Sequence, residues 1–255
     1  MTPGERGPGG AELTIGGLRL FYRDVGEARP GRLPLVLIHG LGVSSDYWAR
    51  LLPILAARRR VCALDLPGFG RSEDPPAILN SAEMARSVAA WLGALGLRRA
   101  HVLAHSQGAQ IAGELADGWP ALVASLTLIG ATIGQRDPAL PRLALRLLRD
   151  VPREDGSLLP VVGRAYLRAG FWWLIRTSAV LNNEDSVGTL ARLTLPVLVV
   201  RGARDPVVTT RSVAQLVAAA PQARAITVPR APHGLHWSSP RTLGSHVNAF
   251  LDEVD

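Results

Sequence analysis

The sequence AHVLAHSQGAQIAGEL, residues 100–115, joins two segments of different pattern through a short turn. Residues 100–104 form a mainly apolar run of strand length, and apolar side chains recur at helical spacing after Gly108. Between these segments, Ser106 has Ala104 two residues before it and Gly108 two residues after it. Small residues at both positions suit a sharp, crowded turn from a strand into a helix. The stretch therefore predicts a strand, a strained turn that presents Ser106, and a helix.

Short apolar runs of the same kind recur along the chain. They lie at Leu33–Ile38, Val61–Leu64, Leu122–Ile129, Leu195–Val200 and Ala225–Val228. Such runs are typical of strands that are buried on both faces of a parallel sheet. Segments with apolar residues at helical spacing separate them. This alternation of strands and helices predicts an α/β fold, in which helices cover both faces of a parallel sheet.

The two ends of the chain differ from this alternating pattern. Glu12–Ile15 and Leu18–Val25 are strand-like and are separated by Gly16-Gly17, which is typical of a hairpin turn. Residues 1–10 are rich in glycine and proline and predict a flexible lead-in. At the other end, Pro240–Leu251 predicts a helix that begins at its proline.

The alternation is interrupted within residues 134–189, which contain no clear strand. Helix-like pieces lie at Arg142–Leu148 and Tyr166–Ser178, and the chain breakers there are Pro152, Pro160 and Gly170. We therefore predict that residues 134–189 form a helical insertion over one end of the sheet. The sheet and its helices would then come from residues 11–133 and 190–255.

Three chemically active side chains follow predicted strands, at the edge where parallel strands end and ligands bind. Ser106, Asp205 and His233 occur in this order, each after a different strand. A serine hydroxyl is a poor nucleophile at neutral pH, but histidine, with a pKa of about 6.5, can accept its proton. A carboxylate on the other ring nitrogen orients the histidine and stabilises its charged form. We predict that Ser106 is a nucleophile, His233 its base and Asp205 the orienting acid.

An oxyanion that forms at such a serine needs hydrogen-bond donors. The backbone N–H of Gln107, at the start of the predicted helix, is the first candidate. The loop His39-Gly40-Leu41-Gly42 follows another strand, and we assign the second donor to the N–H of Leu41. Within this loop, His39 is expected to form structural hydrogen bonds rather than to transfer protons.

Four motifs make the chain resemble the α/β-hydrolase superfamily, in its capped small-molecule branch with a serine nucleophile. They are His39–Gly42, Asp65-Leu66-Pro67-Gly68-Phe69-Gly70-Arg71-Ser72, the Ser106 turn, and the loops of Asp205 and His233. The resemblance implies a mostly parallel, eight-stranded sheet flanked by helices, with a short helical cap after the sixth strand. It also implies that Asp65–Ser72 is a structural loop.

Two departures from the family pattern bear on the site. Ala104 stands where the family has the first glycine of Gly-x-Ser-x-Gly, and its methyl group is expected to fit. His236 lies three residues after His233 and competes for the role of base. The family's base opens the loop after the last strand, and this position favours His233.

The serine at position 106 narrows the range of reactions that the protein is expected to catalyse. Haloalkane dehalogenases and epoxide hydrolases resemble this chain but have aspartate at the position of Ser106. A serine implies a hydrolase that acts on a carboxylic ester, thioester or lactone through an acyl-enzyme. The apolar stretch Phe171–Ile175 is expected to pack the cap against the core. If part of the stretch lines the pocket instead, it indicates a hydrophobic substrate. A C–C hydrolase, a lyase, an acyltransferase or cyclase, and a non-catalytic small-molecule receptor are the alternatives.

Composition excludes several other classes of function. The 255-residue chain has a formal charge of +7, but its arginines are scattered and no nucleic-acid motif is evident. The single cysteine, Cys62, is expected to be a small buried side chain and cannot form an internal disulfide. No apolar stretch is long enough to span a bilayer, and no secretory signal is evident. We expect a cytoplasmic monomer or homodimer with a small-molecule substrate, no metal or organic cofactor, no nucleic acid and no membrane.

Overall fold

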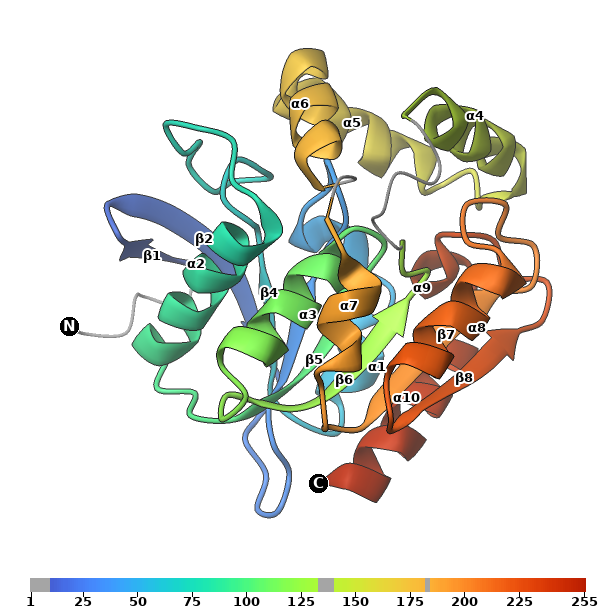
Figure 1. Cartoon of the computed structure of the whole chain (residues 1–255). Helices are drawn as coiled ribbons and strands as arrows, with labels where there is room; N and C mark the ends of the chain where they lie inside the picture. The colour runs from blue at the N-terminus through green and yellow to red at the C-terminus, as the bar shows by residue number, and fades with distance from the viewer. Residues whose placement is uncertain (1–9, 133–139, 182–183) are drawn as a thin grey trace.

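A computed structural model describes residues 10–132, 140–181 and 184–255. Its centre is an eight-stranded sheet with the order β1-β2-β4-β3-β5-β6-β7-β8 (Figure 1). The strands are β1 Ala11–Ile15, β2 Leu18–Val25, β3 Leu35–Ile38, β4 Val61–Leu64, β5 Ala100–His105, β6 Val123–Ile129, β7 Val197–Gly202 and β8 Ala223–Val228. β2 is antiparallel to β1 and to β4, and every other pair is parallel. The predicted mostly parallel sheet is therefore confirmed.

Helices cover both faces of the sheet, as the alternating pattern predicts. One layer contains α2 Ser81–Ala94, α3 Gly108–Gly118, α7 Ser186–Ala191 and α8 Thr210–Ala219. The other contains α1 Leu52–Ala56 and α10 Pro240–Val254, with the short α9 Leu235–Ser238 beside α10. In β3, Val36 and Ile38 pack into the core of the first layer, whereas Leu35 and Leu37 pack into the core of the second. Burial on both faces explains why the inner strands are mainly apolar.

A group of helices is inserted between β6 and β7 and lies above the sheet in Figure 1. It comprises α4 Leu140–Asp150, the 3-10 turn η2 Val151–Arg153, α5 Leu159–Ala169 and α6 Phe171–Leu181. The predicted helix Tyr166–Ser178 is wrong as one piece, because the chain turns at Gly170, where φ is +81°. Glycine adopts this left-handed conformation without steric penalty.

The limits predicted for this insertion stay predictions. The structure does not describe residues 134–139, where the insertion is predicted to start. It also does not describe residues 1–9, which make up nearly all of the predicted lead-in. The predicted end, residue 189, falls inside α7, which packs against α3 and α8 in the helix layer of the sheet.

An ionic cluster with a buried arginine ties the end of the chain to the base of the sheet. The side chain of Arg59 is fully buried, and its two terminal nitrogens lie 3.1 and 3.0 Å from the carboxylate oxygens of Asp255. The same carboxylate lies 3.1 Å from Nε2 of His101, whose Nδ1 lies 2.7 Å from the Ser125 hydroxyl. Burial alone would raise the pKa of Asp255, but hydrogen bonds from Arg59 and His101 hold it below its usual value.

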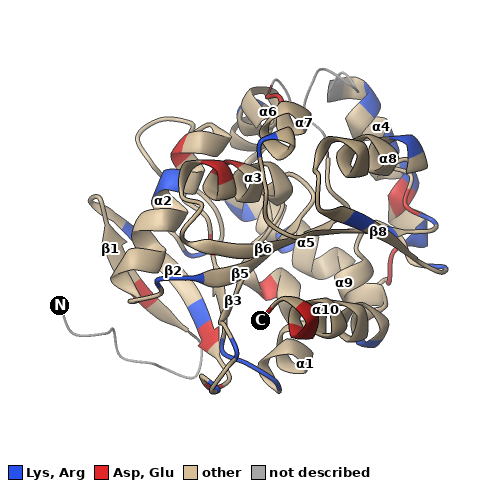
Figure 2. Cartoon of the chain, turned by 60° about the horizontal axis from the view of Figure 1, so that its bottom comes forward, with Lys and Arg blue, Asp and Glu red and all other residues tan. Residues whose placement is uncertain are grey.

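The remaining charges do not form one basic stripe. Arginines are distributed over strands, helices and loops, with acidic residues among them (Figure 2). Cys62 is buried and free, as expected from the sequence, and burial raises the pKa of its thiol to about 12. Among the described residues, no helix is both long and apolar enough to cross a membrane.

Candidate active site

Ser106 lies in a strained turn directly after β5. Its φ is +54°, a left-handed conformation that is uncommon for residues other than glycine. The turn also needs Gly108, because a Cβ atom there would lie 2.4 Å from the backbone oxygen of His39. Ala104 is fully buried in β5, between Ile38 of β3 and Leu128 of β6, and its methyl group is accommodated there. The sequence thus produces the predicted strand, turn and helix, with the serine at the carboxyl edge of the sheet.

The structure brings Ser106, His233 and Asp205 into one hydrogen-bonded series. Nδ1 of His233 lies 2.8 Å from Oδ2 of Asp205, and Nε2 lies 3.1 Å from Oγ of Ser106. A carboxylate accepts hydrogen bonds, so Nδ1–H is the donor to Asp205. Nε2 of the neutral ring is then an acceptor that faces the serine hydroxyl. This is the arrangement in which a histidine can accept a serine proton.

The loop after β7 orients the Asp205 carboxylate. Its Oδ1 accepts hydrogen bonds from the backbone N–H groups of Val207 and Val208, at 2.7 and 3.0 Å. Arg201 stabilises this loop through the carbonyl oxygens of Val208 and Asp205. Burial opposes the charged form of Asp205, but His233 and these hydrogen bonds outweigh it and lower the pKa. Asp205 is therefore an anion at neutral pH.

The pKa of His233 is shifted in the opposite direction. Burial alone would lower it, but the charge and hydrogen bond of Asp205 more than offset burial and raise the pKa above 6.5. The carboxylates of Asp150 and Glu154 contribute further to this increase. The site therefore stabilises the imidazolium that forms when His233 accepts a proton.

His236, the competing histidine, has a different environment. Both of its ring nitrogens are buried without a hydrogen-bond partner in the described part of the chain. Its ring packs against Tyr47 at 4.0 Å and Trp48 at 5.0 Å between ring centroids. Burial and the neighbouring histidines lower its pKa well below 6.5. His233 and His236 have the His-x-x-His spacing of some metal sites, but His236 is a packing residue here.

His105, the residue before the serine, supports the histidine loop. Its Nε2 lies 3.1 Å from the carbonyl oxygen of His233, so Nε2–H donates a hydrogen bond to it. Burial and the neighbouring His233 lower the pKa of His105 to about 3, which keeps the ring neutral. Sequence reasoning missed this role, because nothing in the local pattern relates residues 105 and 233.

The loop at residues 39–42 lies against the serine. A Cβ atom on Gly40 would lie 3.1 Å from Cβ of Ser106, so the glycine allows this close approach. Nδ1–H of His39 donates to the carbonyl oxygen of Gly40 at 2.7 Å, and Nε2 accepts from the N–H of Leu66 at 2.9 Å. Both ring nitrogens of His39 are therefore engaged in the structural hydrogen bonds expected from the sequence.

The predicted oxyanion donors, Leu41 and Gln107, belong to the two turns that meet at Ser106. Gln107 is buried and directly precedes α3, and Leu41 follows Gly40. Neither backbone N–H has an acceptor among the described residues. Both N–H groups therefore stay candidates for donors to a group bound at Ser106.

Asp65 supports the neighbouring loop and does not contact the serine. Oδ1 of its buried carboxylate accepts from the N–H of Ser45 at 2.6 Å, and Oδ2 accepts from that of Arg71 at 2.9 Å. Its backbone oxygen accepts from the Ser72 hydroxyl at 2.5 Å. A Cβ atom on Gly70 would lie only 2.2 Å from the carboxylate. These contacts agree with the structural role that the resemblance implies for this loop.

The apolar stretch Phe171–Ile175 divides between two directions. A Cβ atom on Gly68 would lie 2.8 Å from Trp173, and one on Gly42 would lie 2.7 Å from Leu174. These two side chains therefore point toward loops of the site. Phe171 and Trp172 are 68% and 71% exposed and point away. Part of the stretch thus packs against the loops of Gly68 and Gly42.

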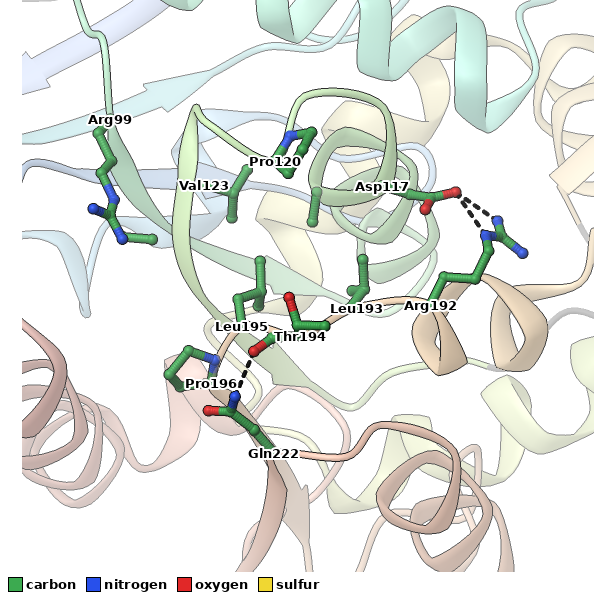
Figure 3. Close-up of a pocket in the computed structure, with 12 residues that line it drawn as sticks. Arg99, Asp117, Pro120, Val123, Arg192, Leu193, Thr194, Leu195, Pro196 and Gln222 are labelled. Atoms are coloured by element: carbon green, nitrogen blue, oxygen red, sulfur yellow. Dashed lines mark hydrogen bonds and ion pairs between the residues drawn. The ribbon is translucent and has the colours of Figure 1, made fainter.

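A separate hollow of about 550 Å³ lies at the opposite end of the strands. Figure 3 shows its lining, in which Asp117 pairs with Arg192 and Gln222 donates to the carbonyl oxygen of Thr194. It lies at the amino ends of β6 and β7, away from Ser106. Its lining residues form no nucleophile–base pair, so it is not the reactive site.

Comparison with known protein families and sequences gives consistent matches. A family model described as the alpha/beta hydrolase fold matches residues 34–160. A pimeloyl-[acyl-carrier protein] methyl ester esterase of Yersinia pestis is 30% identical over 258 residues, which cover 92% of this chain and 98% of that protein. A 2-hydroxy-6-oxononadienedioate/2-hydroxy-6-oxononatrienedioate hydrolase of Pseudomonas putida is 35% identical over 146 residues, or 54% of this chain. The chain spans about half the length of that hydrolase, at 49%.

Another match covers a smaller share of a longer protein. An acetyltransferase component of the acetoin cleaving system of Pseudomonas putida is 38% identical over 126 residues, which cover 49% of this chain and 34% of that protein. The chain thus spans about a third of the length of that acetyltransferase component.

Solved structures resemble the whole chain. A hydrolase from Pseudomonas aeruginosa has a TM-score of 0.79 at 26% identity, and the match covers 96% of this chain and 99% of that one. A bacterial membrane phospholipase A has a TM-score of 0.81 at 25% identity, with 96% and 86% of the two chains covered.

Proposed function

The chain belongs to the α/β-hydrolase family and is an enzyme. From this premise, we propose that it is a serine hydrolase whose nucleophile is Ser106. Its substrate would be a small carboxylic ester, thioester or lactone. The observation that carries the proposal is the series Ser106–His233–Asp205, with separations of 3.1 and 2.8 Å. A relative that is similar over nearly its whole length is named a methyl ester esterase, which supports ester chemistry.

The first half of the reaction acylates the serine. Nε2 of His233 accepts the proton of the Ser106 hydroxyl while Oγ bonds to the substrate carbonyl carbon. The carbonyl oxygen becomes an oxyanion, and the N–H groups of Leu41 and Gln107 donate hydrogen bonds to it. Asp205 stabilises the resulting imidazolium. His233 then returns the proton to the departing alcohol or thiol as the bond to the acyl group breaks.

The second half restores the enzyme. A water molecule attacks the acyl carbon while His233 accepts one of its protons, and the same N–H groups receive the second oxyanion. The bond between Oγ of Ser106 and the acyl carbon then breaks, and His233 returns the proton to Oγ. The products are a carboxylic acid and free enzyme. Only proton transfers and one covalent acyl bond are needed, so this mechanism requires no cofactor.

We infer further that helices α4 to α6 act as a cap that selects the substrate. Trp173 and Leu174 of α6 point toward the loops of Gly68 and Gly42, beside the serine turn. An apolar wall on one side and the two N–H donors on the other suit a small ester with a hydrophobic acyl or alcohol part.

A panel of p-nitrophenyl esters with different acyl chain lengths tests the proposal. We expect a burst of nitrophenol, equal to the enzyme concentration or less, followed by steady turnover. Ser106→Ala should remove both phases, whereas the matched control Ser87→Ala on α2 should keep them. A burst without turnover that an added alcohol or amine rescues would indicate an acyltransferase. Turnover that survives in Ser106→Ala would refute the proposal.

A further inference from the structure

The segment between α4 and α5 reaches from the inserted helices to the loop of His233. Oε1 of Glu154 accepts a hydrogen bond from the N–H of Gly234 at 2.5 Å. Oδ1 of Asp150, at the end of α4, accepts a longer one from the N–H of His233 at 3.4 Å. Two consecutive backbone donors of the histidine loop thus find their acceptors on the insertion, not on the sheet domain.

These contacts complete a set that holds His233 from several directions. The side chain donates to Asp205, the backbone oxygen accepts from His105, and the backbone N–H donates to Asp150. Three residues before His233, the backbone at Arg230 is left-handed, with φ of +61°. Buried backbone groups that lose their partners destabilise the conformation that needs them. The loop therefore depends on acceptors supplied from outside it.

The fit between the insertion and the loop is close. A Cβ atom on Gly234 would lie 2.7 Å from Oε2 of Glu154 and 2.8 Å from Cδ2 of Leu158. Asp150 is buried, and Glu154 is partly buried. Burial and the adjacent Asp150 carboxylate raise the pKa of Glu154 to about 8, opposed by the Gly234 N–H. Two neighbouring carboxyl groups that are withdrawn from solvent lower the stability of a fold. Their presence here therefore suggests a role other than stabilisation.

A second set of bonds fastens the same segment without touching His233. Arg50 donates to Asp155 at 2.8 Å and to Ser157 at 2.7 Å. The indole N–H of Trp237, on α9, donates to the Ser157 hydroxyl at 3.0 Å. Anchoring by Asp155 and Ser157 explains why the segment stays in place. The contacts of Asp150 and Glu154 with the histidine loop are therefore not explained by anchoring of the segment alone.

We propose that Asp150 and Glu154 are positioning residues, which hold the backbone of His233 and Gly234 so that the imidazole stays between Ser106 and Asp205. The proposal rests on the proposed function, because it assigns His233 as the base of Ser106. The insertion then does more than cover the site. It completes the hydrogen bonding of the histidine loop, and the base is aligned only when the insertion is docked.

The test compares acceptor loss with acceptor retention at residue 154. The rate constant for labelling of Ser106 by a fluorophosphonate, and kcat and KM for a p-nitrophenyl ester, are measured in each variant. We expect Glu154→Ala to lower the labelling rate and kcat about tenfold, with KM changed less than about twofold, because the base is misplaced. Glu154→Gln keeps an oxygen acceptor for Gly234 and should restore both to within about threefold of the wild type.

Two more variants make the test decisive. Glu154→Asp withdraws the acceptor by one methylene and should lower the labelling rate like Glu154→Ala, so the result does not depend on the folding of the alanine variant. Asp155→Asn is the matched control, because its carboxylate faces Arg50 and Ser157 and not the histidine loop, and the bonds of Ser157 to Arg50 and Trp237 still hold the segment in place. It should change the melting temperature but leave the labelling rate within about twofold.

The outcomes separate this inference from the proposed function. Labelling of wild-type Ser106 combined with wild-type rates in Glu154→Ala and Glu154→Asp would refute the positioning role alone. A rate in Glu154→Gln as low as in Glu154→Ala would also refute it, since an oxygen acceptor at residue 154 would then not be sufficient to position the loop. Failure of the wild-type protein to be labelled at Ser106 would refute the proposed function itself.

Discussion

His105 and His233 are joined through the main chain, with Nε2 of His105 at 3.1 Å from the carbonyl oxygen of His233. The residue that precedes the nucleophile thus supports the loop that carries the base. The two rings also pack against each other, with centroids 4.7 Å apart. In the proposed mechanism, the positions of the nucleophile Ser106 and the base His233 are therefore coupled through a neutral residue that takes no part in proton transfer.

This coupling predicts that His105→Ala slows the labelling of Ser106 by roughly tenfold while the protein still folds. The missing donor releases the carbonyl oxygen of His233, and the cavity adds some instability. Stopped-flow measurement of fluorophosphonate labelling checks the rate, and thermal unfolding checks the fold. A labelling rate equal to that of the wild type would show that the hydrogen bond has no effect on the base.

The pH dependence follows from the pKa of His233. Proton transfer from Ser106 requires neutral imidazole, so the labelling rate should fall as the pH decreases through this pKa. Asp205 raises the pKa above 6.5, so the midpoint of the acidic limb should lie above that value. In Asp205→Asn the midpoint should move to lower pH, and the rate should fall roughly 10³- to 10⁴-fold. An unchanged midpoint would contradict this assignment of the orienting acid.

Comparison of the two neighbouring histidines tests the identity of the base. His233→Ala should reduce esterase activity nearly as much as Ser106→Ala, since these groups act as a unit. His236→Ala removes a buried ring whose nitrogens have no hydrogen-bond partner in the part of the chain that the structure describes, so it should lower stability by about 1–3 kcal/mol and retain most activity. Steady-state kinetics and urea unfolding distinguish the two. Greater loss of activity in His236→Ala would reverse the assignment.

The ionic cluster at the base of the sheet predicts a stability effect remote from the site. Asp255→Asn leaves the fully buried Arg59 with the carbonyl oxygen of Leu33, at 3.1 Å, and, as its anionic partner among the described residues, the more distant Asp252 carboxylate, at 3.7 Å. We expect a loss of roughly 2–4 kcal/mol in the free energy of unfolding, with the labelling rate of Ser106 unchanged.

The same cluster also predicts the direction in which acid changes the free energy of unfolding. The pKa of Asp255 is lower in the folded protein than its usual 3.8. Its contribution is therefore fully present above that value and is lost as the pH falls through the lowered pKa. The stability difference between wild type and Asp255→Asn should shrink over this acidic range. A difference that persists at the lowest pH would contradict the account.

Local pattern was sufficient to predict much of the fold and part of the candidate site. The apolar runs predicted the strands because burial on both faces demands such runs, and the strand ends differ from the prediction by at most two residues. Ser106, Asp205 and His233 were predicted because parallel strands bring their carboxyl ends to one edge. The structure places the three side chains together, as that reasoning expects.

Contacts between distant segments were not predictable in this way. Nothing in the sequence relates Glu154 to Gly234, since the contact depends on how the insertion docks on the sheet. Gly170 was predicted to be a chain breaker, but the predicted helix-like piece Tyr166–Ser178 still crosses it, because apolar residues recur at helical spacing on both sides. His105 shares this limitation, because its partner lies in a loop that only the folded sheet brings near.

The most direct test of the central claim is peptide mass spectrometry of the protein after reaction with a fluorophosphonate. We predict a single covalent adduct, on the peptide that contains Ser106, formed by the wild-type protein and reduced by orders of magnitude in His233→Ala. Ser87→Ala should be labelled like the wild type. An adduct on another residue, or none on Ser106 in the folded wild-type protein, would contradict the assignment of Ser106 as the nucleophile.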